Sequence, residues 1–151
     1  MSWYLALKYV HVLLAIVAVG SNATYGIWGA RSAQDPQHLG YTLRGIKFID
    51  DRIANPCYIG LLLTGLLLAY VGGISYRTTW IVIAIVAWLV LAALGFGVYT
   101  PTLSHQIKTV EADGWESDAY KRLAMRGRIV GIVLAVIALG IVFDMVVKPQ
   151  F

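Results

Sequence analysis

Charged residues and cysteine are scarce in this sequence. Asp, Glu, Lys and Arg make up 13% of its 151 residues, which is about half of their share in ordinary soluble domains. The single cysteine, Cys57, excludes an internal disulfide. The sequence also contains no glycine-rich phosphate loop, no paired-cysteine metal motif and no nucleophile elbow. It therefore shows no sign of the three kinds of chemistry that these motifs support.

Hydrophobic residues, in contrast, make up 59% of the chain, and the few charges cluster between long apolar runs. A soluble protein of this size would need charges over its whole surface, so we expect most of this surface to face lipid. The formal net charge of +4 does not indicate a nucleic-acid partner, because the basic residues form no stripe or arginine-rich arm. We predict no nucleic-acid binding, and the lipid bilayer as the main partner.

Four apolar runs have about the length of 20 residues that crosses the hydrocarbon core of a bilayer, or exceed it. They lie at approximately 3–30, 53–71, 79–99 and 129–147. These runs predict an all-α integral membrane four-helix bundle that forms a single transmembrane domain over 1–151. We expect the second helix to begin before Pro56 and to bend there, and Thr100-Pro101 to break or kink the third.

Two longer segments connect these spans. In 37–54, apolar residues recur at three- and four-residue steps among charged ones, which predicts an amphipathic helix that lies on the membrane surface or projects from it. The segment 102–118 is polar and predicts a partly helical connection. We expect Gly114 to end this helical part and Ser117-Asp118 to cap the next helix.

Basic residues are distributed unevenly between the two sides of the membrane. The connections after the first and third spans hold Arg31, Arg44, Lys47, Arg52, Lys108, Lys121, Arg122, Arg126 and Arg128, and the opposite side holds Lys8, Arg77 and Lys148. Cytoplasmic loops carry an excess of Lys and Arg. This distribution predicts an N-out/C-out orientation, with both long connections in the cytoplasm.

Three ionisable residues lie within the predicted spans, namely Lys8, His11 and Asp144. Such residues are costly in a membrane and usually face the interior of the bundle. Lys8 and His11 belong to a stripe of polar and small residues along the first helix, as expected for a helix-packing face. With Met145, these residues share the outer half of the bilayer, so they meet if the first and fourth helices are neighbours.

Three interpretations of this cluster remain open. In the first, Lys8 and Asp144 form an ion pair, with His11 hydrogen-bonded beside it. In the second, His11 ligates a metal, and we expect haem iron, with Lys8 or Asp144 near a propionate and Met145 as the candidate for the second axial ligand. The third is a proton relay. The other two histidines are predicted on the cytoplasmic side, away from this depth.

Three short motifs carry a resemblance to known families. The stretch Leu7-Lys8-Tyr9-Val10-His11-Val12-Leu13-Leu14-Ala15, followed by Gly20, is similar to the start of several small bacterial membrane families. Asn55-Pro56 through Thr64-Gly65 and Phe143-Asp144-Met145-Val146-Val147-Lys148-Pro149 resemble the second helix and carboxyl end of a family of predicted integral membrane proteins of unknown function. More distantly, the chain resembles the membrane-type protoporphyrinogen oxidase and copper-resistance protein D groups.

The oxidase resemblance implies a b-type haem on His11, with Lys8 assisting. We therefore expect a small redox-associated protein of the bacterial inner (cytoplasmic) membrane, multi-pass, that holds haem b through His11. A non-catalytic transmembrane subunit of a larger complex or homo-oligomer is the alternative, and a small transporter component is the third hypothesis.

Overall fold

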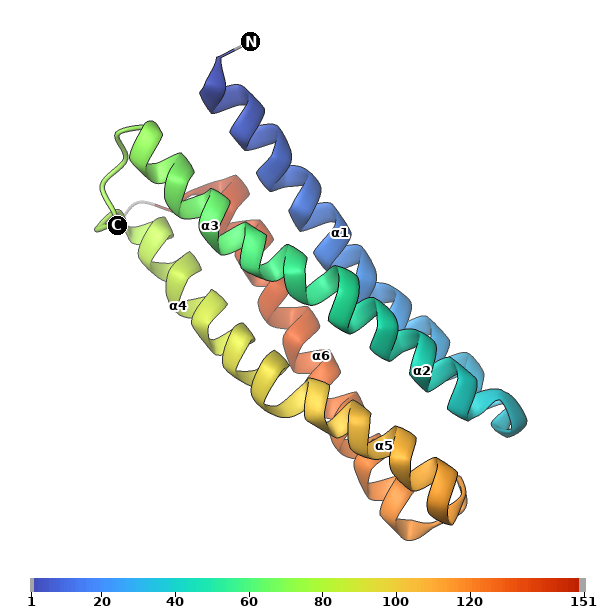
Figure 1. Cartoon of the computed structure of the whole chain (residues 1–151). Coiled ribbons are helices and arrows are strands. Elements are labelled where there is room, and N and C mark those ends of the chain that lie inside the picture. The colour runs from blue at the N-terminus through green and yellow to red at the C-terminus, as the bar shows by residue number, and fades with distance from the viewer. Residues whose placement is uncertain (1, 150–151) are drawn as a thin grey trace.

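A computed structural model of the chain describes residues 2–149, which form long helices that run side by side (Figure 1). The helices are α1 (Trp3–Ser32), α2 (Leu39–Ile49), α3 (Asn55–Val71), α4 (Thr79–Leu94), α5 (Thr100–Asp113) and α6 (Asp118–Val147). A 3-10 turn, Pro36–His38, precedes α2. Two π-helical turns, Asp50–Ala54 and Gly95–Tyr99, join α2 to α3 and α4 to α5.

The helices combine into four continuous rods. The rods are Trp3–Ser32, Pro36–Val71, Thr79–Asp113 and Asp118–Val147, and each is long and apolar enough to cross a membrane. This confirms the predicted all-helical fold with four helices capable of spanning a bilayer. The predicted domain extends over 1–151, and residues 1, 150 and 151 lie outside the described part.

The two ends of the molecule differ in what they contain (Figure 1). The start of α1, the end of α6 and the α3–α4 connection lie at one end, here called the terminal end. The α1–α2 and α5–α6 connections lie at the other, here called the turn end.

Short sequence signals set the helix ends. Gly114 has a φ of 80° and ends α5, because glycine adopts this left-handed region without the steric cost that a Cβ brings. The hydroxyl of Ser117 accepts a hydrogen bond from the Tyr120 N–H at 3.2 Å and caps α6, as serine often does at this position. Both predictions are confirmed.

Thr100-Pro101 was predicted to break or kink the third helix, and it does not break it. The helix continues from α4 through the π turn Gly95–Tyr99 into α5. A π turn moves the backbone hydrogen bond from the fourth to the fifth residue along, and the Thr100 N–H accordingly donates to the Gly95 carbonyl. Pro101, which has no N–H to donate, then lies in the first turn of α5.

The helix predicted in 37–54 is present as α2, and it continues through the π turn Asp50–Ala54 into α3. Its buried residues Leu39, Leu43 and Ile46 belong to the same hydrophobic cluster as Leu103 of α5. The apolar side of α2 therefore packs within the protein, on a neighbouring rod.

The core is narrow, because each rod contributes only one buried stripe. Ala18 of α1 is fully buried, and Leu134 and Ala138 of α6 lie in the same cluster. Large apolar side chains such as Trp3 and Leu63 are more than half exposed. Such a surface suits a lipid surrounding rather than water.

Candidate functional site

His11 lies on α1 and contacts α3. Its Nδ1 is 2.7 Å from the Thr64 hydroxyl oxygen, and the same hydroxyl donates to the Gly60 carbonyl, four residues earlier, at 2.7 Å. Helical threonines commonly form this backbone bond, and it occupies the only hydroxyl proton. We therefore assign His11 Nδ1 as the donor to Thr64, which leaves a lone pair on Nε2.

Two glycines on α3 make room for α1. A Cβ added at Gly65 would lie 3.2 Å from His11 Cε1, and a Cβ added at Gly60 would lie 3.0 Å from Leu14 Cδ1. Small residues let membrane helices approach closely, and Gly60 and Gly65 permit this approach between α1 and α3. The space beside Gly65 is taken by the His11 ring.

The residues of the predicted cluster are not joined to one another by polar contacts within residues 2–149. Lys8 is exposed, Met145 is half-buried and Asp144 is only 5% exposed. Within residues 2–149, no ion pair or hydrogen bond links Lys8 to Asp144, or His11 to either of them. The predicted ion pair is not formed, because the Lys8 side chain is exposed whereas Asp144 is buried, although α1 and α6 are in contact.

Asp144 lies in the last turn of α6. Its Oδ2 atom is buried and, within the described part of the chain, has no hydrogen-bond partner. The nearby Lys148 ammonium lies 5.4 Å from the centre of the Trp80 ring of α4, which is within the range of a cation–π interaction. Across residues 2–149, no three or more His, Cys, Asp or Glu side chains gather as a metal site.

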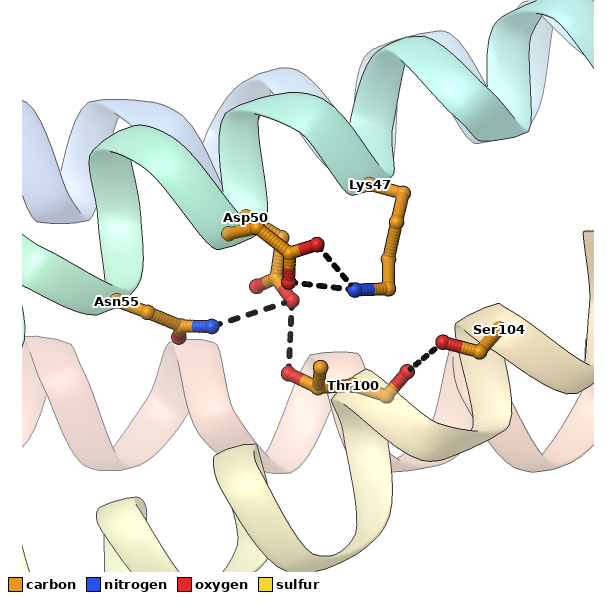
Figure 2. A network of polar contacts seen from close by, with 6 residues as sticks. Lys47, Asp50, Asn55, Thr100 and Ser104 are labelled. Carbon is orange, nitrogen blue, oxygen red and sulfur yellow. Dashed lines mark hydrogen bonds and ion pairs between the residues drawn. The ribbon is translucent and has the colours of Figure 1, made fainter.

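A second polar group, which the sequence analysis missed, surrounds the π turn that begins at Asp50 (Figure 2). Asp50 is only 4% exposed. Its Oδ2 accepts a hydrogen bond from the Thr100 hydroxyl at 2.7 Å and from the Asn55 amide at 3.5 Å. Lys47, one turn earlier, pairs with the exposed Asp51 instead.

A small cavity of about 20 Å³ lies against this carboxylate, which is enough space for a water molecule. Asp50, Asn55 and Tyr58 line it from one rod and Asn22 from α1. Asn22 donates to the Tyr58 hydroxyl at 2.6 Å. The cavity therefore brings together polar atoms from the first two rods of the chain.

Aromatic rings enclose the same region. Tyr99, at the end of the second π turn, lines the cavity and stacks on Tyr25 of α1 with ring centroids 6.0 Å apart. The buried Tyr25 hydroxyl has no hydrogen-bond partner within residues 2–149. Trp88 Nε1 donates to the Tyr58 carbonyl at 3.0 Å, which ties α4 to α3 beside the cavity.

A sequence signal for Asp50 does exist. The buried residues of this rod follow one stripe at three- and four-residue steps: Leu39, Leu43, Ile46, Asp50 and Ala54. The carboxylate thus occupies a core position of an otherwise apolar face. In the sequence, Asp50 is one of several charged residues in the connection 37–54. It therefore did not stand out as a candidate site residue.

Comparison with known families matches residues 5–149 to the family described as predicted integral membrane protein (DUF2269). The chain belongs to this family, so it is a membrane protein with four helices able to span the bilayer. No curated protein and no solved structure matches it.

Proposed function

We propose that this member of the predicted integral membrane protein family binds haem b through His11 and takes part in electron transfer. The observation that supports the proposal is the hydrogen bond between His11 Nδ1 and Thr64. Metal-ligating histidines almost always donate their other ring N–H to a fixed acceptor, which sets the tautomer and the orientation of the ring. With Nδ1 as the donor, Nε2 is the free ligand atom.

The donor set suits haem better than a metal held by protein ligands alone. No cluster of three metal-ligating side chains exists within residues 2–149, and haem iron needs only one or two axial ligands. His11 lies about 12 Å along the helix axis from Trp3, within the first apolar span. The exposed Lys8, one turn nearer the terminal end, is available to pair with a propionate.

Each residue then has a defined task. His11 binds, Thr64 holds the ring, and Gly65 keeps the space that the ring needs. Haem, when bound, supplies one-electron exchange, and its potential depends on the axial ligands and their hydrogen bonds. Met145 and Asp144 of α6 remain the candidates for the second axial position and for a propionate contact.

We also propose the N-out/C-out orientation in the bacterial inner membrane. The turn end carries most of the basic residues of the connections, and it lies on the cytoplasmic side by the positive-inside rule. His11 then lies in the half of the bilayer that faces away from the cytoplasm.

The test is a reduced-minus-oxidised visible spectrum of the detergent-purified protein, produced with ample haem. We expect haem bands in the parent and in His105→Ala, because His105 is an exposed residue of α5. His11→Ala should lose the bands, and Thr64→Val should keep bound haem but shift its reduction potential.

Two outcomes would overturn the proposal. One is a folded, colourless parent, and the other is a folded His11→Ala variant with the haem content of the parent. Folding is checked by far-ultraviolet circular dichroism and a single gel-filtration peak. Either outcome would favour the alternative of a non-catalytic subunit, which co-purification of partner chains would then test.

A further inference from the structure

The buried carboxylate of Asp50 lacks a counter-charge. It is 4% exposed, and none of the three ion pairs formed within residues 2–149 includes it. The nearest cation along the helix, Lys47, binds Asp51. Buried charges in proteins are normally paired or coordinate a metal ion, because an isolated one is very costly.

Neutral polar groups surround the same carboxylate, and two of them, the Thr100 hydroxyl and the Asn55 amide nitrogen, donate hydrogen bonds to it. The Thr100 hydroxyl is 2.7 Å from Asp50 Oδ2, and the side chains of Asn22, Asn55 and Tyr58 line the adjoining cavity. Carboxylate, amide, hydroxyl and water oxygens are hard ligands, which suit cations such as Na⁺ rather than soft transition metals. The cavity of about 20 Å³ holds one small ion or one water.

The two π turns found within residues 2–149 both border this cavity. The Asn55 N–H donates to the Asp50 carbonyl, and the Thr100 N–H donates to the Gly95 carbonyl, each across five residues. π turns are rare and occur frequently at functional sites. Here each turn is followed directly by a residue that hydrogen-bonds to Asp50 (Figure 2).

We propose that Asp50 and the polar residues around it bind a sodium ion. A single carboxylate matches a monovalent charge, and an anionic oxygen is a ligand of high field strength, which favours the smaller Na⁺ over K⁺. Asp50 lies just before the apolar run 53–71, toward the turn end, so an ion reaches it from the aqueous side of that end. This proposal does not depend on haem binding by His11.

The experiment measures binding of radioactive sodium to the purified full chain in detergent, at constant ionic strength maintained with choline chloride. We expect saturable binding that unlabelled NaCl displaces and that equal KCl displaces much less. Asp50→Asn should abolish it. Asp51→Asn makes the same atomic change in the exposed neighbouring carboxylate. This variant should retain sodium binding.

A second variant covers the case in which Asp50→Asn does not fold. Thr100→Val keeps the shape of the side chain but removes the hydroxyl that contacts Asp50. We expect its sodium affinity to fall by about tenfold or more, as is typical when a group that orients a metal ligand is removed.

Three results would overturn the proposal. The first is a folded parent without saturable sodium binding. The second is sodium binding that Asp50→Asn or Thr100→Val leaves unchanged. The third is an infrared band of a protonated carboxyl group in the parent at saturating sodium that Asp50→Asn removes, because Asp50 would then be neutralised by a proton.

Discussion

The packing of α5 on α6 depends on a missing side chain at Gly127. A Cβ at this position would collide with the Nε2 atom of Gln106 on α5. Gln106 is 7% exposed and donates from the same atom to the Leu123 carbonyl at 3.0 Å. Gly127→Ala should therefore displace the Gln106 amide and break this bond between the two helices.

Gly140, on the same helix, supplies a matched control. A Cβ there would have nothing within 4 Å. Replacing a helical glycine with alanine gains up to about 1 kcal/mol from backbone entropy, and this gain is shared by both variants. The difference between them is the cost of the displaced amide, about 1–3 kcal/mol for a buried polar group that loses its partner.

The assay is reversible unfolding by sodium dodecyl sulphate in dodecylmaltoside micelles, followed by far-ultraviolet circular dichroism. We expect Gly127→Ala to have a free energy of unfolding lower than that of Gly140→Ala by about 1–3 kcal/mol. In a Gln106→Ala background the obstruction is gone, so the two alanine variants should agree to within about 0.5 kcal/mol. Equal stability of the two variants in the parent background would refute the reasoning.

Three further predictions use the same unfolding assay. Tyr25→Phe should not lower the free energy of unfolding, because its buried hydroxyl has no partner within residues 2–149; a loss would reveal a bond to water. Ser117→Ala should lower it by about 1 kcal/mol, since the cap of the Tyr120 N–H is removed, and an unchanged value would contradict the cap. A double-mutant cycle of Arg44→Ala and Glu111→Ala, which tests their ion pair at 2.5 Å, should give about 0.2–1 kcal/mol. This coupling should fall in high salt, and a coupling that persists would contradict the exposed setting of the pair.

The spans were predictable because run length alone indicates a membrane helix. Gly114 and Ser117 were predictable because their signals act within one turn of the backbone. The continuation through Pro101 was not, since proline usually signals a helix boundary and no local pattern indicates the π turn that precedes it. The packing of α2 on α5 also explains why these more polar helices continue both rods beyond their apolar runs.

The candidate site was predictable only in part. The position of His11 on a packing face could be derived from its spacing to other small and polar residues. Its partner could not, because periodicity within α1 does not say which of the other rods it meets. His11 was expected beside a Lys8–Asp144 pair if the first and fourth helices were neighbours, whereas Gly60 and Gly65 bring α3 close enough for Thr64 to contact His11.

The two proposed sites can be separated experimentally because they lie far apart on one rigid rod. Eleven residues of α1 separate His11 from Asn22 of the cavity, which corresponds to about 16 Å along the helix axis. Effects at sites more than about 7–10 Å apart with no shared partners usually add. Asp50→Asn should therefore leave a spectrum that depends on His11 unchanged. If sodium instead shifted the reduction potential of a bound haem, the two sites would be energetically coupled, and the contact of α1 with the π turn at Asp50 would be the first place to look for the cause.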